Sequence, residues 1–473
     1  MTNLSGANLN NGAAVGPQGE GRESPSSFPK YPVYKDSGVE WLGVVPEHWG
    51  VSPLKWLVEQ VTDKATTSDF QVGLENIEGW TGRFIETDTE FAGDGIAFRQ
   101  EDILFGKLRP YLAKVWLAGR SGQAVGDFFV LRPRTVNSEF LHKYILTPTV
   151  IEDLNASTIG AKMPRVGWED MAALAVTLPS HKEQTQIARF LDHETARIDA
   201  LIEEQQRLIE LLKEKRQAVI SHAVTKGLDP TVPMKDSGVE WLGEVPAHWH
   251  VGALKHFISP VPGAIKTGPF GSHLKSEDMK EGPYKVFNQR SVIDADFSAG
   301  DNFISEEKFG ELRGFTAFPG DVLVTTRGTI GRAAILPDNA EVGILHPCLL
   351  RIQVEKSKIT SSYLCRLIQE SHLLKTQLSL LSNSTTIEVI YSETMANLFI
   401  PVPPITEQGQ IAGFLDDVIR KFGALTSDAN ESVRLLQERR SALISAAVTG
   451  KIDVRGWQPP ASAPTPELVE EAV

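Results

Sequence analysis

The sequence predicts a mixed α/β protein with two variable domains separated by two long antiparallel helices that pack as a coiled coil. Two internal repeats lead to this prediction. The stretch 178–230 recurs 224 residues later as 402–454, so that Glu183 corresponds to Glu407. The block KDSGVEWLG at Lys35 recurs 200 residues later at Lys235. The chain therefore contains one plan twice, with pseudo-twofold symmetry: an anchor block, a variable region and a long helix.

Each copy of the longer repeat carries an apolar seam with seven-residue spacing. That spacing is typical of helices that pack side by side along their length. The plainer alternative is two amphipathic helices in separate cores, but about 40 residues is longer than an ordinary globular helix. The residues that we expect to pack between the helices are Leu191, Ile198, Leu201, Leu212, Val219, Leu415, Phe422, Leu425, Leu436 and Leu443.

Length and composition indicate an ordinary protein of several domains. With 473 residues the chain is too long for one core, and it is 41% apolar and 23% charged. No run of 18 apolar residues and no secretory leader is found, so we expect no membrane span and a cytoplasmic location. The only cysteines, Cys348 and Cys365, have no partners at metal spacing, which disfavours disulfides and zinc. The net charge of -13 argues against a protein that coats nucleic acid indiscriminately.

The two anchor blocks predict how the repeats connect. The second anchor begins directly after the first long helix, so the first anchor should lie near the end of the second helix, close to Val454. The variable domains would then lie at opposite ends of the helix pair. His48 and His248 each precede a tryptophan in a PxHW turn. A packed turn is favoured over a catalytic pair at these histidines.

The variable regions share one recognisable pattern. Residues 95–117 and 314–336 each read as an apolar strand, a basic turn containing glycine, and a second strand. Elsewhere the regions differ, which indicates the same task performed on two different targets.

Motifs for catalysis are missing. We find no NPPY-like or DPPY-like methyltransferase motif, no phosphate-binding G-x-x-x-x-G-K-[ST], no HExxH and no GxSxG. We therefore expect a binding protein without catalytic residues and without a metal site.

Taken together, the EQxxIAxFLD helix entry, the LLxExRxxxIxxAVT run and the turn GDVLVTTRGTIGRAAI resemble the specificity subunit of type I restriction-modification enzymes. The resemblance covers roughly Tyr31 to Arg455 in both repeats. It implies two target recognition domains, each reading one half of a bipartite, asymmetric sequence in double-stranded DNA, with the helices setting the unread spacer. It also implies two methylation subunits that use S-adenosylmethionine and two restriction (translocase-nuclease) subunits that use ATP and Mg, while this chain binds no cofactor.

If the resemblance holds, the chain divides into six segments. They are a disordered N-terminal segment (1–30), target recognition domain 1 (31–180), spacer helix 1 (181–228), target recognition domain 2 (229–404), spacer helix 2 (405–452) and a flexible tail (453–473).

Candidate DNA contacts lie on basic turns and polar loops. Arginine can bind guanine through two hydrogen bonds, and asparagine or glutamine can do the same with adenine. The candidates in the first domain are Lys107, Arg109, Lys114, Lys162 and Arg165. Those in the second are Lys266, Ser272, His273, Lys275, Asn288, Gln289, Arg290, Arg327, Arg332, Asn383, Ser384, Thr385 and Thr386. For each of them, a solvated surface or a structural role is the alternative.

A rival function from another class is a coiled-coil scaffold whose variable domains bind proteins or small ligands. Neighbouring genes for a methyltransferase and a helicase-nuclease would decide for DNA. A solitary or shuffled specificity gene without working partners would have the same residues.

Overall fold

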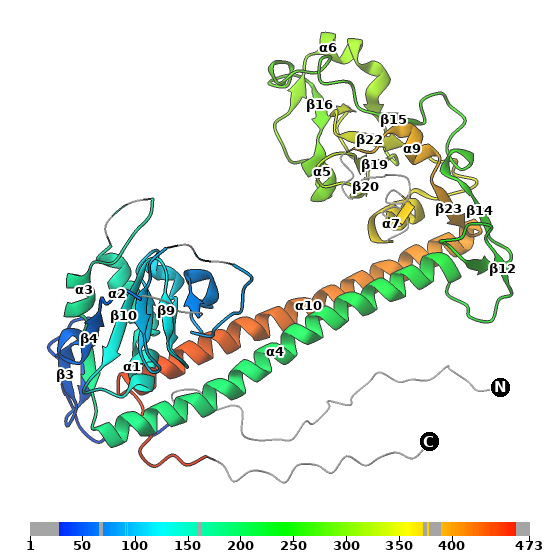
Figure 1. The fold of residues 1–473 in the computed structure, drawn as a ribbon. Coiled ribbons are helices and arrows are strands. Elements are labelled where there is room, and N and C mark those ends of the chain that lie inside the picture. The colour runs from blue at the N-terminus through cyan, green and yellow to red at the C-terminus, as the bar shows by residue number, and fades with distance from the viewer. Residues whose placement is uncertain are drawn as a thin grey trace, which may run out of the picture. The chain divides into compact units, whose positions relative to one another are not determined.

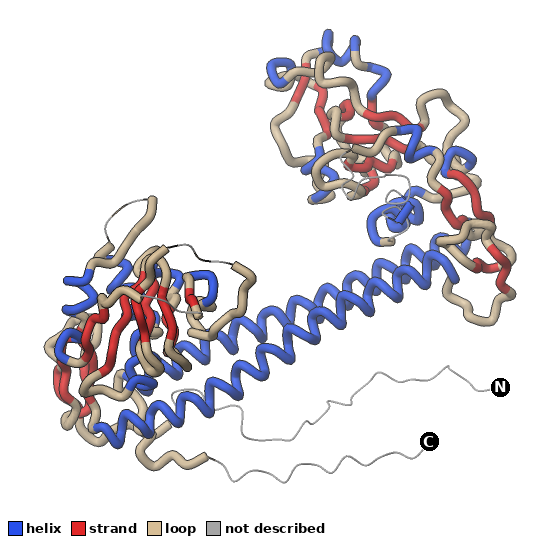
Figure 2. Tube along the Cα trace, viewed as in Figure 1, coloured by secondary structure: helices blue, strands red, loops and turns tan. Residues whose placement is uncertain are grey.

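The computed structural model describes residues 28–65, 70–89, 91, 93–158, 160, 162–371, 376–377 and 389–459. It divides into two compact units, residues 1–206 with 431–473, and residues 207–430. Each unit holds one mixed α/β domain and one stretch of each long helix (Figures 1 and 2). The predicted contacts Asn383 to Thr386 lie outside the described residues, as do most of the predicted disordered segment and tail.

The first domain is built on a four-stranded antiparallel sheet and a smaller three-stranded sheet. The order of the larger sheet is β4 (Val58–Val61), β10 (Phe128–Pro133), β7 (Ile103–Gly106), β8 (Val115–Leu117). The smaller sheet contains β5 (Gln71–Val72), β9 (Gly122–Ala124) and β6 (Ile96–Phe98). Three helices follow, α1 (Ser138–Ile145), α2 (Pro148–Ala156) and α3 (Trp168–Ala173). Short pairs β1 (Tyr34–Asp36) with β2 (Val44–Pro46), and β3 (Gly50–Pro53) with β11 (Ala175–Leu178), complete it.

The second domain repeats the larger sheet in the same strand order and has one more strand in its second sheet. Its larger sheet has the order β15 (Ile265–Thr267), β22 (Leu349–Ile352), β19 (Val322–Thr325), β20 (Ala333–Ile335). Its second sheet has the order β17 (Phe303–Ile304), β16 (Tyr284–Phe287), β21 (Gly343–Leu345), β18 (Thr316–Ala317). The short pairs are β12 (Met234–Asp236) with β13 (Glu244–Pro246), and β14 (His250–Ala253) with β23 (Phe399–Val402). The helices are α5 (Gln289–Ile293), α6 (Glu306–Glu311), α7 (Ser361–Glu370) and α9 (Ser392–Ala396).

Each predicted strand, basic turn and strand forms a β-hairpin. In the first domain β7 pairs with β8 through Phe105 and Val115, and in the second β19 pairs with β20 through Val324 and Ala333. The two domains therefore share a fold in which the hairpin turns occupy equivalent places.

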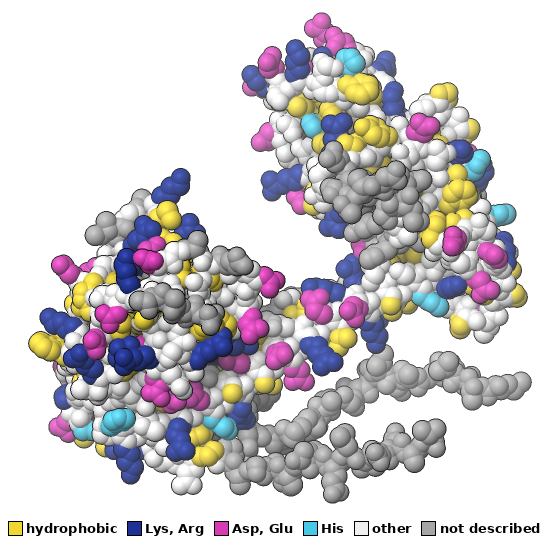
Figure 3. Space-filling model, viewed as in Figure 1, with side chains coloured by type: hydrophobic (Ala, Val, Ile, Leu, Met, Phe, Trp, Pro, Cys, Tyr) yellow, Lys and Arg dark blue, Asp and Glu magenta, His cyan; other side chains and the backbone are white. Residues whose placement is uncertain are grey.

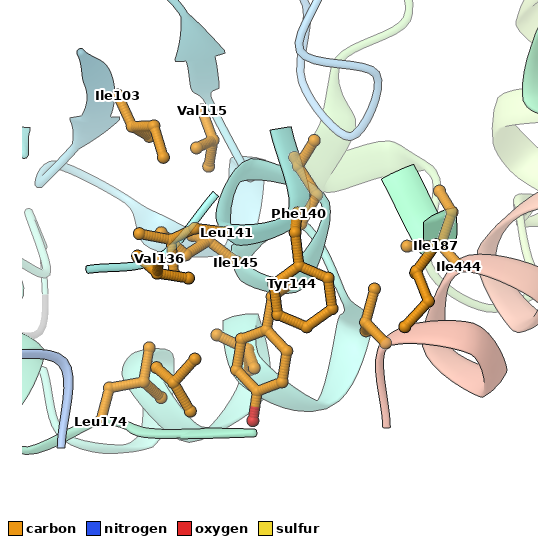
Figure 4. Packing of buried hydrophobic residues seen from close by; sticks show 14 of the residues in the cluster. Ile103, Val115, Val136, Phe140, Leu141, Tyr144, Ile145, Leu174, Ile187 and Ile444 are labelled. Carbon is orange, nitrogen blue, oxygen red and sulfur yellow. The ribbon is translucent and has the colours of Figure 1, made fainter. Parts of the chain in front are cut away.

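The long helices are α4 (His181–Lys226) and α10 (Ile405–Val448). In the first unit Ile187 and Leu191, from the beginning of α4, share a core with Leu443 and Ile444, from the end of α10. Figure 4 shows Ile187 and Ile444 beside Phe140 and Tyr144 of α1. In the second unit the end of α4 shares a core with the beginning of α10. The helices therefore run antiparallel within each unit, as predicted.

Most of the predicted seam residues are at least partly buried. Leu191, Ile198, Leu415 and Leu443 are at most 4% exposed, while Val219, Phe422 and Leu436 pack at the edges of the cores and Leu212 is half-buried. Leu201 and Leu425 differ from the prediction, being 44% and 51% exposed. Ile202, one residue after Leu201, contacts the core instead. Leu201 and Leu425 each lie three positions after a seam residue, Ile198 and Phe422, so they stand at the border of the apolar face, where burial depends on the neighbouring structure.

The ordered chain extends beyond the predicted boundaries at both ends of the first unit. Val454 is 1% exposed, and Phe28 and Trp457 lie against Phe190 with ring centroids at 5.3 and 5.4 Å. Their apolar side chains cover the beginning of α4, so the predicted tail from residue 453 starts with packed structure. None of the described helices is long and apolar enough to cross a membrane.

Candidate nucleic-acid interface

A glutamate at the beginning of each long helix holds the anchor block, Glu183 being buried and Glu407 partly exposed. The Glu183 carboxylate accepts hydrogen bonds from Trp49 Nε1 at 3.1 Å and Tyr31 Oη at 2.6 Å, and lies 3.1 Å from His48 Nε2. Burial, together with the hydrogen bond to Glu183, raises the pKa of the Tyr31 phenol above its usual value. Glu407 accepts equivalently from Trp249 Nε1 at 3.1 Å. These contacts support the packed-turn interpretation of the PxHW motifs.

The next residue of each helix attaches the recognition domain. Gln184 Oε1 accepts from the backbone N–H of Asn137 at 2.8 Å, and Gln408 Oε1 accepts from that of Thr360 at 2.8 Å. Asn137 and Thr360 are the N-caps of α1 and α7, whose side chains accept from backbone N–H groups in the first helical turn. Both glutamine side chains are at most 3% exposed. The same amide therefore fixes the start of the same helix in both units.

An ion pair extends the attachment by two helical turns. Asp192 pairs with Lys143 of α1 at 2.9 Å, and Asp416 pairs with Arg366 of α7 at 2.6 Å. Both carboxylates are about half exposed, so each pair contributes at most about 1 kcal/mol. The repeated EQxxIAxFLD motif is thus explained as the attachment of a recognition domain to its helix.

The end of each helix lies against the anchor of the same unit, as predicted from the chain order. Gly450 has a φ of 74°, and a Cβ there would be 2.3 Å from Pro46 Cδ. In the second unit Lys226 Nζ donates to the Glu244 carbonyl at 2.6 Å.

The predicted DNA contacts of the first domain come together from two distant segments. The backbone N–H of Arg109, in the β7–β8 turn, donates to the Pro164 carbonyl at 2.8 Å, and Leu108 forms a β-bridge with Arg165. Lys162 belongs to the same loop as Pro164 and is exposed. On the face shown in Figure 3, Lys and Arg side chains of this domain lie among hydrophobic ones.

Other candidates in the first domain have partners of their own. Lys114 Nζ donates to the Leu74 carbonyl at 2.6 Å, and Lys107 Nζ lies 5.2 Å from the Phe129 ring centroid. Arg165 pairs with Asp127 at 2.9 Å. Among the described residues, none pairs with the charged groups of Arg109 or Lys162. These two cations are the ones best placed for a phosphate or a base edge.

In the second domain the hairpin turn meets the beginning of α5. Gln289 Nε2 donates to the Arg327 carbonyl at 2.9 Å, and Arg327 forms a β-bridge with Val389, as Leu108 does with Arg165. Arg332 ends the same turn and is exposed. The structure thus places Gln289, Arg327 and Arg332 on one edge of the domain.

The remaining candidates of the second domain are dispersed or held structurally. Asn288 Oδ1 caps α5, Lys266 Nζ lies 4.3 Å from the Phe315 ring centroid, and Arg290 pairs with Asp294 at 3.1 Å. Ser272, His273 and Lys275 are exposed in the glycine-rich loop after β15. The Gly268 N–H at the start of that loop donates to the Leu349 carbonyl at 2.8 Å. Leu349 pairs with Thr325, which precedes the hairpin turn that contains Arg327.

Sequence reasoning did not single out two arginines that brace the domains against the helices. Arg440 of α10 donates to Asp199 of α4 at 2.8 Å and to the Trp80 carbonyl at 3.3 Å. Its equivalent in the first repeat, Arg216, pairs with Glu370 of α7. The shared spacing of 224 residues was the available signal.

The chain is thus a duplicated binding protein in which two domains of one topology present different polar edges. The family model for the type I restriction modification DNA specificity domain matches residues 86–212 and 271–434. The chain belongs to this family of specificity subunits.

Relatives match along most of their length. The type I restriction enzyme MjaVIII specificity subunit of Methanocaldococcus jannaschii is 24% identical over 87% of this chain and 94% of its own. The EcoBI specificity subunit of Escherichia coli is 22% identical over 81% and 80%. A chain solved in work on assembly and conformational transition of the type I R-M system superposes with a TM-score of 0.67, at 19% identity, over 85% of this chain and 98% of that chain. The last likeness supports the fold.

Proposed function

We propose that this chain is the DNA-reading subunit of a type I restriction-modification system. Each recognition domain reads one half of a bipartite, asymmetric target, and the helices set the spacer between the halves. The observation that carries the proposal is the repeated attachment: Glu183 with Gln184, and Glu407 with Gln408, hold two domains of one topology in the same way. The edges of those domains differ in sequence.

The different edges support unequal half-sites. The first domain presents Arg109 and Lys162, whereas the second presents Gln289, Arg327 and Arg332. Sequence is read by hydrogen bonds to base edges, while phosphate contacts set orientation. Two unlike readers therefore select two unlike half-sites rather than a palindrome.

Catalysis belongs to partners in this proposal. Two methylation subunits carry S-adenosylmethionine, and two restriction subunits use ATP and Mg. Because the chain has a net charge of -13, the partners also supply much of the salt-dependent phosphate contact.

The purified chain with S-adenosylmethionine alone should methylate no DNA, and adenine methylation by the isolated chain would contradict this division of roles.

The deciding experiment is methylome sequencing of a host with and without the gene, with partner subunits present. We expect one split motif to gain adenine methylation only when the gene is present. An unchanged methylome alongside expressed, folded partners would argue against DNA specificity.

A further inference from the structure

The hairpin turn of the first domain differs from its counterpart in what it exposes. In the β7–β8 turn, Tyr111 and Leu112 are 46% and 39% exposed. Aligning Phe105 with Val324 on one side of the turn and Val115 with Ala333 on the other shows that the first turn is one residue longer. Ile330 therefore stands where the first turn has Tyr111 and Leu112. Ile330 packs against the core of the second unit. The first turn therefore presents an aromatic and an aliphatic side chain where the second turns its apolar residue inward.

The backbone around Tyr111 is held in an unusual conformation. Arg109 and Ala113 have φ values of 51° and 47°, in the left-handed region that disfavours side chains. The corresponding positions of the second turn are Gly328 and Gly331, with φ values of 64° and 78°. Non-glycine residues persist in such conformations only where their surroundings enforce them, which happens most often at functional sites.

Hydrogen bonds hold the first turn from both sides. The Arg109 N–H donates to the Pro164 carbonyl at 2.8 Å, and the Trp80 N–H donates to the Ala113 carbonyl at 3.0 Å. The Trp80 carbonyl in turn accepts from Arg440 of α10 at 3.3 Å. Gly79 leaves no room for a side chain, because a Cβ there would be 2.3 Å from the Leu112 carbonyl oxygen. We call the exposed residues Tyr111 and Leu112 the tip of the turn. Hydrogen bonds through Trp80 connect this turn to Arg440 of α10.

Cations flank this tip. Arg109 lies two residues before Tyr111. Lys162 lies on the loop whose Pro164 carbonyl accepts from Arg109, next to Met163, which is 47% exposed. Phosphates attract the cations, while bases stack on aromatic rings and unstack around apolar wedges. A rigid apolar tip with cations beside it therefore has the features needed to bind a DNA duplex and to insert between its stacked bases.

We propose that Tyr111, supported by Leu112, inserts against a base step of the half-site read by the first domain. Arg109 and Lys162 then bind the adjacent phosphates. The second domain, whose equivalent turn hides Ile330, reads its half-site without this insertion. This inference rests on the proposed DNA-reading function and adds a local DNA distortion at one half-site only.

The test uses 2-aminopurine fluorescence, which rises when a base loses stacking. The probes are duplexes carrying the bipartite target that methylation mapping defines, with one base at a time replaced by 2-aminopurine in either half-site. The methylated adenines are left unreplaced, because methyltransferases take their target base out of the stack. With the full-length chain and its methylation subunits, we expect a several-fold rise at one step of the first half-site. In Tyr111→Ala the rise should disappear, and the affinity for the target should fall about tenfold, as for the loss of one stacked base.

Two variants serve as controls. Tyr111→Phe keeps the ring and should keep the rise, whereas Trp56→Ala removes a 70% exposed ring of the first unit outside the turn and should change nothing. A rise that persists in Tyr111→Ala, equal rises in both half-sites, or no rise on a target that the wild type binds would each overturn the insertion. Failure of the proposed function is distinguishable, because the wild type would then not prefer the mapped target over a scrambled duplex.

Discussion

At the scale of single residues, His142 makes the stability of the first domain depend on pH. The ring is 6% exposed in α1, and its Nε2 lies 3.2 Å from the Val115 carbonyl oxygen. Burial lowers the pKa of His142 from 6.5 to about 3. Between these values the unfolded chain binds a proton that the folded chain does not, so stability is full above pH 6.5 and is lost as pH falls towards 3.

We therefore predict that His142→Gln, which cannot titrate, flattens this dependence. For the wild type, the free energy of unfolding of the first domain should fall by about 2 kcal/mol between pH 7 and pH 5 through this residue. Urea unfolding at both pH values measures the difference. An unchanged slope in the variant would show that other groups cause the acid sensitivity.

Two glycines at the helix ends allow a matched comparison. Gly450 and Gly227 have φ values of 74° and 78°, so alanine costs about 1–2 kcal/mol at either position. A Cβ at Gly450 would also lie 2.3 Å from Pro46 Cδ, whereas at Gly227 the nearest atoms are Glu407 Oε1 at 3.1 Å and Trp249 Cζ2 at 3.2 Å. Gly450→Ala should therefore lower the melting temperature more than Gly227→Ala. Equal losses would mean that Pro46 gives way freely.

At the scale of elements, the glutamine attachments should each hold one domain. Gln184→Ala leaves the Asn137 N–H without its acceptor and should destabilise the first domain by about 1–3 kcal/mol, with faster amide exchange at the start of α1. Gln408→Ala should act in the same way on α7 alone. Gln437→Ala, on an exposed position of α10, is the control and should have no effect. Exchange that accelerates in both domains after either change would contradict independent attachment.

At the scale of the whole molecule, the helices should determine the unread spacer while each attachment keeps its half-site. Four residues inserted between Glu203 and Leu212, with the same insertion in the equivalent stretch 427–436, add about one turn to both helices. The methylated motif should then have a longer spacer and both original half-sites. Methylome sequencing reads both features, and an altered half-site would contradict the ruler model.

Much of this organisation could be predicted because it repeats along the chain. The spacing of 224 residues identified both long helices, and the seam residues Leu191 and Leu415 are fully buried. The hairpins were also predictable, since strand alternation and a basic turn are local signals. The exposure of Leu201 and Leu425 was not predictable, because they lie at the border of the apolar face, where burial depends on tertiary neighbours.

The sequence indicated which polar and basic residues are candidates for DNA contact, but not which of them have a structural role instead. Asn288 caps α5, and Lys114 donates to the Leu74 carbonyl; neither pairing could be read from spacing, because both depend on tertiary neighbours. Tyr111 was passed over because its exposure follows from the left-handed residues on either side of it.

By itself, the sequence determined the duplication, the two long helices and the family, because periodicity and repeated motifs are properties of the chain. Only the tertiary structure decided that Glu183 and Gln184 attach a domain, and that the tip at Tyr111 is exposed while Ile330 is packed inward. The reason is physical: hydrogen-bond partners and burial are set by residues distant in sequence, and those contacts exist only once the strands have paired and the helices have packed.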